Sequence, residues 1–432
     1  KFYKKYKGES KVKNSKVCFV GMTHLGLNMA AAYSEKNAHI LCFDNNQEKL
    51  DQIKKGALPF SEPKLNYLLK KNYKKIFFTS NPSDLKKCNI IFIAEDVKTN
   101  KQGRSDLTQV KKLITLVRKH ANSKAISVLL SQIPPKFTRK HFFNKERVFY
   151  QVETLIFGQA ISRALKPERF IIGCLRPEKE LPTEYKKLLL SFRCPILKMN
   201  YESAEICKTA INMYLASSIT FANTLAEISE KTGGDWEEVK KAMQLDKRIG
   251  KYSYITPGLG ISGGNIERDL ITLMKVSKKL KIRPGLIDAC LKDSVHRKTW
   301  ALDQVKKIGL NLKKSKIAIL GLAYKPGTNS IKNSPSVELI KNLRNSVLNL
   351  HDPLVQNHST QKNTIFFSNP LSAIKGCDAL IVMTPWQQYK RLPLEKICKL
   401  LKKPNIIDPY RIFDHRKILR KKINYYSIGI KC

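Results

Sequence analysis

The clearest chemical signal in the chain is a glycine-rich segment that ends in polar side chains. It runs Pro257-Gly-Leu-Gly-Ile-Ser-Gly-Gly-Asn-Ile-Glu-Arg-Asp269 and leads directly into a helical pattern. Glycine lets backbone amides come close to a bulky ligand. Asn265, Arg268 and Asp269 add an amide, a cation and a carboxylate where that ligand would lie. The segment is therefore predicted to contact a ligand.

Lys208 and Asn212 form a second candidate for chemistry. They are four residues apart in a long helical pattern, so they share one face of the helix. A lysine and an amide presented together can stabilise a hydroxyl as it becomes a carbonyl, or exchange a proton with it. For an isolated pair with this spacing, a solvated lysine beside an incidental asparagine would be the better interpretation. The motifs around the pair favour the chemical interpretation.

A glycine turn near the start of the chain predicts a nucleotide-binding fold. An apolar strand pattern at residues 16–20 leads into Gly21 and Gly26, and Thr23 stands where such turns carry a second glycine. In a dinucleotide-binding fold this turn places the pyrophosphate at a helix N-terminus. Asp44 follows a second strand pattern, where an acid binds the ribose hydroxyls, although a strand-ending turn residue is the alternative. Because no arginine follows Asp44, the pattern favours NAD over NADP.

These residues need elements that hold them, and the pattern predicts an α/β fold. Helical patterns alternate with further strand patterns at residues 76–78, 89–94, 125–130 and 169–172. Such alternation is typical of a doubly wound parallel sheet. A long helical stretch follows from about Ser203, and a strand-turn-helix pattern begins again at about Lys313. We therefore expect two Rossmann-like doubly wound parallel sheet domains joined by a central all-helical domain.

The composition is that of a globular chain with several domains. The chain has 432 residues, 42% of them hydrophobic and 27% charged, which is too long for one ordinary core. No apolar run is long enough to span a bilayer and no signal peptide is recognised, so we expect a cytoplasmic protein without a membrane partner. The ten cysteines and eight histidines show no metal-ligand spacing. We therefore expect reduced thiols and no metal.

The charge balance is strongly basic. Lysine and arginine number 80 against 35 acidic residues, for a net charge of +45. Nucleic-acid-binding proteins often show such a balance. The lysines here are spread over every helical pattern and no nucleic-acid-binding motif interleaves aromatic residues with them, so we do not expect a nucleic-acid partner. We favour compositional bias that also attracts anionic nucleotides, and we expect residues 1–14 to form a basic N-terminal arm.

Short motifs in a fixed order resemble those of one enzyme family. They are the glycine turn, Gly56–Pro63, Lys166–Gly173, Lys208 with Asn212, Asp246–Gly250, the glycine-rich segment 257–269, Gly321–Lys325, Asn333–Pro335 and Asp408–Arg411. Each motif is weak alone. Their common order over nearly the whole chain makes it similar to the UDP-glucose/GDP-mannose dehydrogenase family, the nucleotide-sugar 6-dehydrogenases.

The resemblance implies an NAD-dependent oxidoreductase that acts on a UDP- or GDP-sugar, with a UDP-sugar favoured. It also implies a homodimer or larger homo-oligomer built on the central helices, and a place in the synthesis of polysaccharide or surface-glycan precursors. The expected domains are an NAD-binding domain at 15–200, a central helical dimerisation domain at 201–312 and a sugar-nucleotide-binding domain at 313–432.

The resemblance also assigns roles to individual residues by their positions in the motifs. The implied catalytic residues are Glu153, Lys208, Asn212, Asn265 and Asp269. The implied cofactor contacts are Gly21, Thr23, Gly26, Asp44, Arg268 and Lys332. The implied sugar-nucleotide contacts are Arg248, Tyr252, Gly258, Gly260, Lys325 and Arg411, with Arg248 expected to reach a ligand across the dimer interface.

Asn265 is the most important departure from the family pattern. The family carries its catalytic cysteine here, and a thiolate must add to the aldehyde before a second hydride can leave. Asparagine cannot attack a carbonyl. Three functions stay open: one two-electron oxidation or its reverse, a four-electron oxidation through an aldehyde hydrate with Glu153 or Asp269 activating water, and a non-catalytic sugar-nucleotide binder. We favour them in that order, and the retained acid, lysine and amide count against the third. Further departures are Thr23, Glu95–Lys98, Gln132, Ser330 and Lys332.

Overall fold

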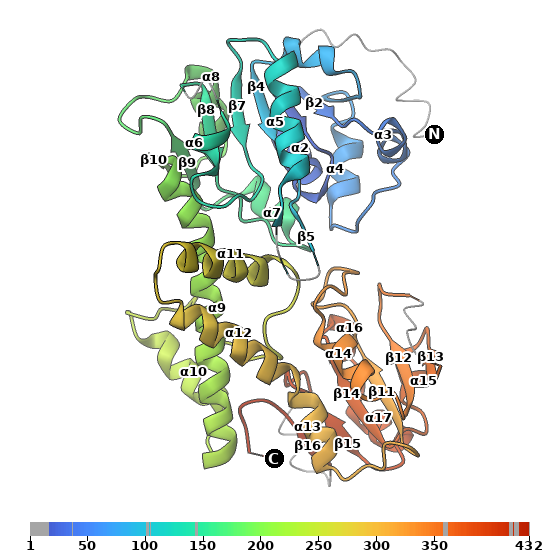
Figure 1. The fold of residues 1–432 in the computed structure, drawn as a ribbon. Helices are drawn as coiled ribbons and strands as arrows, with labels where there is room; N and C mark the ends of the chain where they lie inside the picture. Colours follow the sequence, from blue (N-terminus) through green and yellow to red (C-terminus); the bar gives the residue numbers. More distant parts are fainter. Residues whose placement is uncertain are drawn as a thin grey trace. The chain divides into compact units, whose positions relative to one another are not determined.

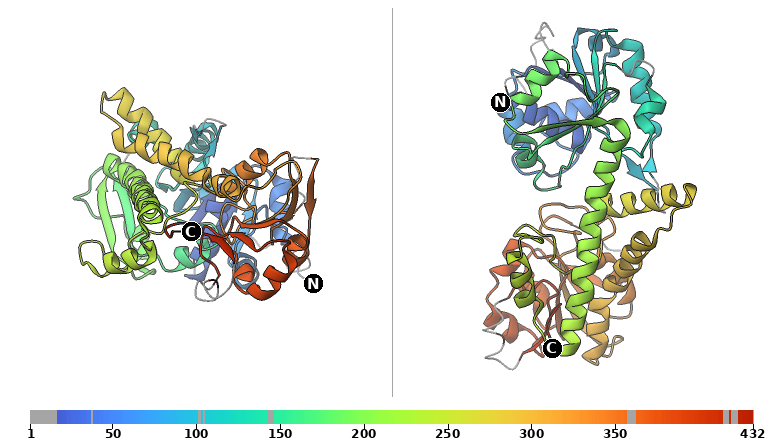
Figure 2. Two further views of the ribbon diagram at one scale, coloured as in Figure 1. Left: turned by 90° about the horizontal axis from the view of Figure 1, so that it is seen from below. Right: turned by 90° about the vertical axis from the view of Figure 1, so that its left-hand side faces the viewer.

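The structure is a computed structural model that describes residues 17–36, 38–100, 103, 105–142, 146–356, 362–413, 418 and 423–431. The basic arm expected at residues 1–14 lies outside these ranges. The chain forms two compact units, Lys1–Ile211 and Asn212–Cys432, whose elements are labelled in Figure 1. The long helix α9 (Tyr201–Thr232) begins in the first unit and ends in the second, and it is seen along its length in the right-hand view of Figure 2.

The first unit is built on a mainly parallel sheet. Its described strands are, in spatial order, β10 (Ile196–Asn200), β9 (Phe170–Cys174), β8 (Val148–Gln151), β7 (Ile126–Leu129), β4 (Ile90–Ile93), β1 (Val17–Val20), β2 (Ile40–Phe43) and β3 (Ile76–Thr79). All residues of β1 and β4 are buried, as expected for central strands covered on both faces.

The two strands at one edge of this sheet differ from the prediction. The parallel arrangement is confirmed from β3 to β8, but β9 pairs with β8 in the antiparallel direction and β10 follows β9 in parallel. An antiparallel neighbour needs no right-handed crossover. The segment between β8 and β9 is therefore free to place α7 (Ala160–Leu165) against α2 (His24–Glu35).

The remaining elements of the first unit connect the strands. They are α3 (Gln47–Lys54), α4 (Leu65–Lys71), the short 3-10 helix η1 (Pro82–Lys87), the hairpin strands β5 (Lys98–Thr99) and β6 (Ser105–Asp106), α5 (Thr108–His120), α6 (Phe137–His141) and α8 (Thr183–Leu190).

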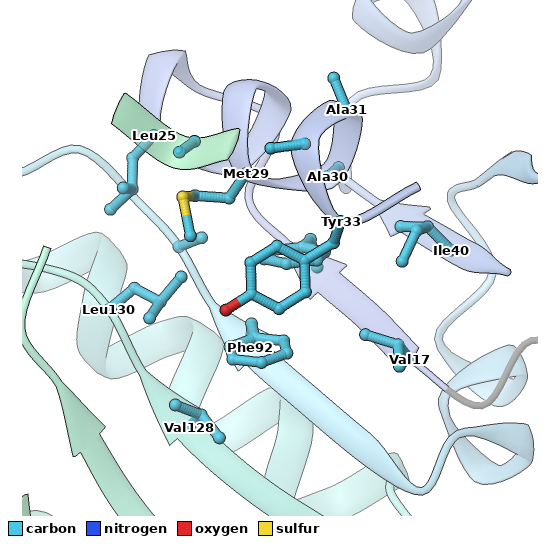
Figure 3. Packing of buried hydrophobic residues seen from close by; sticks show 14 of the residues in the cluster. Val17, Leu25, Met29, Ala30, Ala31, Tyr33, Ile40, Phe92, Val128 and Leu130 are labelled. Carbon is cyan, nitrogen blue, oxygen red and sulfur yellow. The ribbon is translucent and has the colours of Figure 1, made fainter. Parts of the chain in front are cut away.

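Apolar packing fixes α2 on the sheet. Tyr33 of α2 meets Phe92 of β4 edge to face, with ring centroids 5.3 Å apart. Phe19 of β1 stacks on the same phenylalanine ring at 4.7 Å. Figure 3 shows Tyr33 and Met29 lying over Phe92 and Leu130. Because α2 starts at the glycine turn, this packing holds the turn against the ends of β1 and β4.

The helices of the second unit gather on the C-terminal part of α9. They are α10 (Trp236–Leu245), α11 (Asn265–Lys279), α12 (Gly285–Lys298) and α13 (Trp300–Lys307). Asn223 of α9 donates to the carboxylate of Asp293 on α12 at 3.1 Å, and Arg297 of α12 donates to Glu227 of α9 at 3.2 Å. Polar contacts therefore fasten α12 to α9 on successive turns.

The second unit also contains a parallel sheet. Its described strands are, in spatial order, β13 (Thr364–Phe366), β12 (Val347–His351), β11 (Lys316–Leu320), β14 (Ala379–Val382), β15 (Asn405–Ile407) and β16 (Asn424–Tyr426). Its flanking helices are α14 (Pro335–Asn342), α15 (Pro370–Ile374), α16 (Gln387–Lys390) and α17 (Leu394–Leu400).

The predicted class is confirmed, because one Rossmann-like sheet precedes the helices α9 to α13 along the chain and a second follows them. The predicted domain boundaries at 15–200, 201–312 and 313–432 stay a prediction. In the described part of the chain, every helix is too short or too polar to cross a membrane. The nine cysteines within the described ranges are free thiols.

Candidate active site

The glycine turn after β1 requires its glycines. Gly21 has φ +99°, and a Cβ atom there would lie 2.9 Å from Oε2 of Glu95. A Cβ atom on Gly26 would lie 1.9 Å from the Gly21 carbonyl oxygen. The first turn of α2 therefore packs directly on the end of β1, which is the geometry that brings helix amides to a pyrophosphate.

Asp44 lies beside this turn at the carboxyl end of β2. Its Oδ2 accepts the Met22 N–H at 2.9 Å and the Lys49 ammonium at 2.7 Å, and its Oδ1 accepts the Asn46 N–H at 3.1 Å. The side chain is partly buried. A carboxylate held at this point can meet ribose hydroxyls, so the turn and Asp44 together fit an NAD cofactor.

Two further carboxylates face the turn. Asp96 Oδ2 accepts the Leu25 N–H in the first turn of α2 at 3.1 Å. The Asp96 N–H donates to the Thr23 hydroxyl at 3.0 Å, and that hydroxyl donates to the Ala94 carbonyl at 3.1 Å. The sequence identified Glu95 and Asp96 only as departures from the family pattern. Their contact with the turn depends on the pairing of β1 with β4, which spacing along the chain does not reveal.

Sequence analysis gave no role to Glu62, which ties the turn to the segment after β8. Its Oε2 meets Nε2 of His24 at 2.9 Å and accepts the Gly158 N–H at 2.9 Å. Its Oε1 accepts the Ala160 N–H at 2.9 Å. His24 also stacks on Phe157, with ring centroids 3.8 Å apart. The position of Glu62 inside the motif Gly56–Pro63 was the available signal.

The structure brings Glu153 and Lys208 together within the first unit. The Lys208 ammonium donates to the backbone carbonyl of Glu153 at 2.6 Å. Burial raises the pKa of the Glu153 carboxyl to about 7, although a hydrogen bond from Gln151 and the positive charges of Lys208 and Arg163 oppose this rise. A carboxyl group that titrates near neutral pH can accept or release a proton during turnover.

A series of hydrogen bonds between buried polar side chains supports Glu153. The Gln151 amide donates to Glu153 Oε1 at 2.6 Å and to the Tyr33 hydroxyl at 3.3 Å. The Tyr185 hydroxyl donates to Gln151 Oε1 at 2.8 Å. Gln151, Tyr33 and Tyr185 are fully buried or nearly so. The carboxyl of Glu153 is thus held by a residue that sequence analysis did not single out.

In the second unit, Asn212, Arg268 and Asp269 form one buried group. The Asn212 amide donates to Asp269 Oδ2 at 2.5 Å, and Nε of Arg268 lies 3.4 Å from Asp269 Oδ1. All three side chains are less than a tenth exposed. Lys208 and Asn212 follow each other by one turn on α9, with Lys208 in the first unit and Asn212 in the second.

The glycine-rich segment is fixed at several points within the second unit. The Gly258 N–H donates to the Asn223 side chain at 2.8 Å, and the Ile261 N–H donates to the Ser294 hydroxyl at 2.9 Å. A Cβ atom on Gly260 would lie 2.5 Å from the Ser294 carbonyl oxygen. The segment is therefore held closely against α9 and α12.

Asn265 is the first residue of α11 and is exposed. The glycine before it lies against Lys332, because a Cβ atom on Gly264 would meet Cε of Lys332 at 2.9 Å. The Gly263 N–H donates to the Lys332 carbonyl at 3.1 Å. The structure thus places two predicted ligand contacts, Asn265 and Lys332, at the start of the same helix.

The remaining predicted substrate residues lie in different surroundings. The Lys325 ammonium lies over the ring of Tyr324, 5.6 Å from its centroid, and that ring packs against Gly263. Arg411 pairs with Asp235 through two hydrogen bonds of 2.6 and 3.1 Å. The side chains of Arg248 and Tyr252 are largely exposed. Their predicted contacts with a sugar nucleotide stay predictions.

Side chains that could bind a metal ion are not clustered in the described residues. No group of three or more histidine, cysteine, aspartate or glutamate side chains has the arrangement of a metal site there.

Three domain models of one family match the chain. The NAD binding domain of the UDP-glucose/GDP-mannose dehydrogenase family matches residues 15–190, its central domain matches residues 202–293, and its UDP binding domain matches residues 318–415.

Individual proteins and a solved structure are also similar to the chain over nearly its whole length. The chain is 29% identical over 433 residues to UDP-glucose 6-dehydrogenase TuaD of Bacillus subtilis, covering 96% of this chain and 93% of the relative. It is 28% identical to the UDP-glucose 6-dehydrogenase of Rickettsia bellii, covering 96% and 99%. A UDP-glucose dehydrogenase structure from Pyrobaculum islandicum matches in fold with a TM-score of 0.84 at 22% identity, covering 98% and 100%.

Proposed function

Because the chain belongs to the UDP-glucose/GDP-mannose dehydrogenase family, we propose that it transfers one hydride from a sugar hydroxyl of a UDP-sugar to NAD⁺. The chain is an NAD-dependent enzyme with a nucleotide sugar as its substrate. The names of its relatives, UDP-glucose 6-dehydrogenases, support UDP as the nucleotide. The observation that carries the proposed chemistry is the neighbourhood of Glu153 and Lys208 in the unit that holds the cofactor turn.

The cofactor would be held by the turn at Gly21 and Gly26 and by Asp44, and bound NAD⁺ supplies the hydride acceptor. The residues of the chain then have to deal with the hydroxyl proton. We assign that proton to Glu153, whose pKa of about 7 lets it ionise at neutral pH. The Lys208 ammonium stabilises the negative charge that develops on the oxygen as the C=O bond forms.

Asn265 supports a reaction that ends after this first oxidation. A second hydride can leave only after a nucleophile has added to the aldehyde, and an asparagine amide does not add. No cysteine lies between residues 257 and 269. The proposed product is therefore a nucleotide-linked aldehyde or ketone, and the same residues would serve the reverse reduction.

The stoichiometry of cofactor reduction tests this proposal. The protein is incubated with NAD⁺ and a panel of UDP-, GDP- and dTDP-sugars, and NADH is counted against product identified by mass. One NADH per molecule of aldehyde or ketone supports the proposal. Two NADH per uronate would replace it with the four-electron route through a hydrate. Ligand-induced thermal stabilisation without turnover would identify a sugar-nucleotide binder instead.

Lys208→Ala tests the assigned roles separately. We expect turnover to fall by at least about a hundredfold, the scale of one positioned charge in a transition state, while NAD affinity measured by titration changes little. Lys231→Ala is the matched control, because Lys231 is an exposed lysine on the same helix. Unchanged turnover in Lys208→Ala would remove Lys208 from the mechanism.

We also propose that the chain forms a homodimer through α9. Tyr214, Phe221 and Ile228 are between 43% and 64% exposed and lie seven residues apart, so they line one face of the helix. Exposed apolar faces of this kind mark protein interfaces. Light scattering of the full chain should give twice the mass of 49.4 kDa, and Phe221→Glu with Ile228→Glu should give the monomer.

A cytoplasmic location, with its product used for polysaccharide precursors, stays our proposal for the setting. The free thiols of the nine described cysteines suit a reducing compartment.

A further inference from the structure

The cofactor turn contains an internal competitor for a pyrophosphate. In a dinucleotide-binding fold, the amides of the first helical turn and the positive end of the helix dipole attract the phosphate oxygens. Here the N-cap residue Thr23 makes no side-chain cap bond to the 12-residue helix α2. The carboxylate of Asp96, which comes from the end of β4, accepts the Leu25 N–H in that turn at 3.1 Å.

We propose that Asp96 occupies the place of the cofactor pyrophosphate at the N-terminus of α2, so that NAD has to displace this carboxylate in order to bind. Asp96 then lowers the affinity for the cofactor, with Glu95 adding to its effect. The proposal rests on cofactor binding alone and is independent of the reaction that follows.

The backbone of Asp96 stays attached while its side chain can leave. The Asp96 N–H donates to the Thr23 hydroxyl at 3.0 Å, and this hydroxyl donates to the Ala94 carbonyl at 3.1 Å. The hydrogen bond from the Leu25 N–H, in contrast, goes to the side chain of Asp96 and not to its backbone. A rotation of this side chain therefore frees the helix amide without breaking the link between β4 and the turn.

Glu95 adds a second charge at the same place. Its Oε2 lies 2.9 Å from the position that a Cβ atom would take on Gly21. Its N–H donates to the Ser131 hydroxyl at 3.0 Å. The charged groups that face it are Lys49 of α3, Asp44 after β2, and Asp96 and Lys98 of its own segment. Burial, together with the negative charges of Asp96 and Asp44, raises the pKa of Glu95 to about 7, although Lys49 and Lys98 oppose this rise.

The sign of the pH effect follows from this pKa. Glu95 is mostly neutral below about pH 7 and mostly ionised above it, whereas a pyrophosphate diester stays fully ionised over the whole interval. Repulsion between Glu95 and the cofactor therefore appears as the pH rises through 7. The affinity of the wild-type protein for NAD should increase as the pH falls from 8 to 6.

The decisive measurement is the dissociation constant of NAD, determined by calorimetric titration of the full chain without a sugar nucleotide. Asp96→Asn keeps an acceptor for the Leu25 N–H but removes the charge. We expect its affinity for NAD at pH 8 to rise about tenfold, as expected for one charge contact in a partly solvated site. Adenosine, which carries no pyrophosphate, should bind both proteins equally.

Glu184→Gln is the matched control, because it removes one exposed negative charge from α8. Glu184 lies near Val17 and Asn89, at the amino ends of β1 and β4 and therefore at the opposite end of these strands from the glycine turn. Its NAD affinity should equal that of the wild type. An equal gain in Glu184→Gln and Asp96→Asn would overturn the proposal, since net charge would then explain both. An unchanged or weaker affinity in Asp96→Asn would also overturn it.

Glu95→Gln isolates the pH effect. Its NAD affinity should be nearly the same at pH 6 and pH 8, whereas the wild type should bind several times more tightly at pH 6. Retention of the full wild-type pH dependence in Glu95→Gln would exclude Glu95 from the effect. Should Asp96→Asn fail to unfold cooperatively on heating, Asp96→Ser replaces it and is expected to show the same gain in affinity.

Discussion

The two sheets of this protein share the arrangement of their first four strands along the chain and differ in what closes their first turn. In each sheet the first strand along the chain pairs with the second on one side and with the fourth on the other, β1 with β2 and β4, and β11 with β12 and β14. Gly21 and Gly321 follow the first strands with φ of +99° and +98°. Asp44 and Asp352 follow the second strands.

The two aspartates are used differently. Asp352 is 7% exposed, and its Oδ2 accepts the N–H groups of Leu322 and Ala323 at 2.7 and 3.0 Å and the indole N–H of Trp386 at 3.2 Å. It closes the turn from inside. Asp44 is partly exposed and takes one turn amide, that of Met22, so it can still meet a ribose.

The helices that follow the two turns also differ. In the first sheet α2 begins three residues after Gly21, and in the second sheet α14 begins only at Pro335. The intervening residues of the second sheet include Lys325 and Lys332, which sequence analysis assigned to ligands. A glycine and an aspartate at the same two topological positions therefore do not by themselves define a dinucleotide site. Whether such a turn can bind a dinucleotide also depends on where the following helix starts and on whether the aspartate is exposed to solvent.

Gly26→Ala should have the largest effect, because it tests whether α2 must touch the turn. Its Cβ atom would lie 1.9 Å from the Gly21 carbonyl oxygen, so α2 has to move away from β1. We expect a loss of about 3 kcal/mol in the free energy of unfolding, as for an overpacked core, and loss of measurable NAD binding. Chemical denaturation and calorimetric titration check the two effects.

Gly285→Ala provides the control, because a Cβ atom at this first residue of α12 meets nothing within 4 Å. Its stability should stay within about 1 kcal/mol of the wild type. Gly321→Ala should destabilise the second unit, since its Cβ atom would lie 2.4 Å from that of Thr384. Tight NAD binding by a stable Gly26→Ala protein would contradict the comparison.

Asp44→Asn and Asp352→Asn should separate affinity from stability. For Asp44→Asn we expect NAD affinity to fall by about tenfold with little change in the unfolding midpoint. For Asp352→Asn we expect a loss of about 2 to 3 kcal/mol, the value of hydrogen bonds to a buried charge, with unchanged NAD affinity. The same two measurements serve both variants. Reversed outcomes would mean that the second turn, and not the first, holds the dinucleotide.

Much of this fold could be predicted because its signals are local. The apolar runs before Gly21 and Gly321 and the switch to a helical period near Ser203 are visible in consecutive residues. The antiparallel direction of β9 is not visible there, because the sequence of a strand does not show in which direction it runs relative to its neighbours. Direction depends on how the segment after β8 packs on α2.

The candidate site shows the same limit at the level of side chains. Lys208 and Asn212 were found because helical spacing is regular. Gln151 was not, because its partners Tyr33 and Tyr185 are brought to it by helix packing on the sheet. Glu62 was not, because His24 and Gly158 are likewise distant from it in the sequence. The competition of Asp96 for the helix amide likewise appears only when β4 lies beside β1.

Two carboxyl groups that follow later strands, Glu153 after β8 and Asp408 after β15, also differ between the two sheets. Burial raises the pKa of both Glu153 and Asp408. Asp408 is fully buried and accepts the N–H groups of Ile412 and Phe413 and the Tyr425 hydroxyl, which suits a structural carboxyl. The side chain of Glu153 accepts a bond from Gln151.

Gln151→Leu should therefore change the pH dependence of turnover. Loss of its hydrogen bond raises the pKa of Glu153 further, so the base form of Glu153 appears at higher pH. We expect the rise of kcat with pH to move up by about one unit, with a several-fold loss at pH 7 that is regained near pH 9. A loss that persists at high pH would indicate structural damage. Asp408→Asn, in contrast, should lower stability without moving the pH profile.

The smallest expected difference concerns the two threonines that link the fourth strand to each turn. The Thr384 hydroxyl is buried and donates to the Ala323 carbonyl at 2.6 Å, and the partly exposed Thr23 hydroxyl donates to the Ala94 carbonyl and accepts the Asp96 N–H. Thr384→Ala should cost about 1 kcal/mol and leave NAD affinity unchanged.

Thr23→Ala should cost less stability, because water can satisfy the groups it releases. It also loosens the segment that holds Asp96 at the helix, so NAD affinity should rise, though less than in Asp96→Asn, where the charge itself is gone. Thermal unfolding and NAD titration of both variants make the comparison. If Thr23→Ala weakened NAD binding, the hydroxyl would be a cofactor contact and not a tether for Asp96, and the two turns would differ by one more ligand-binding group.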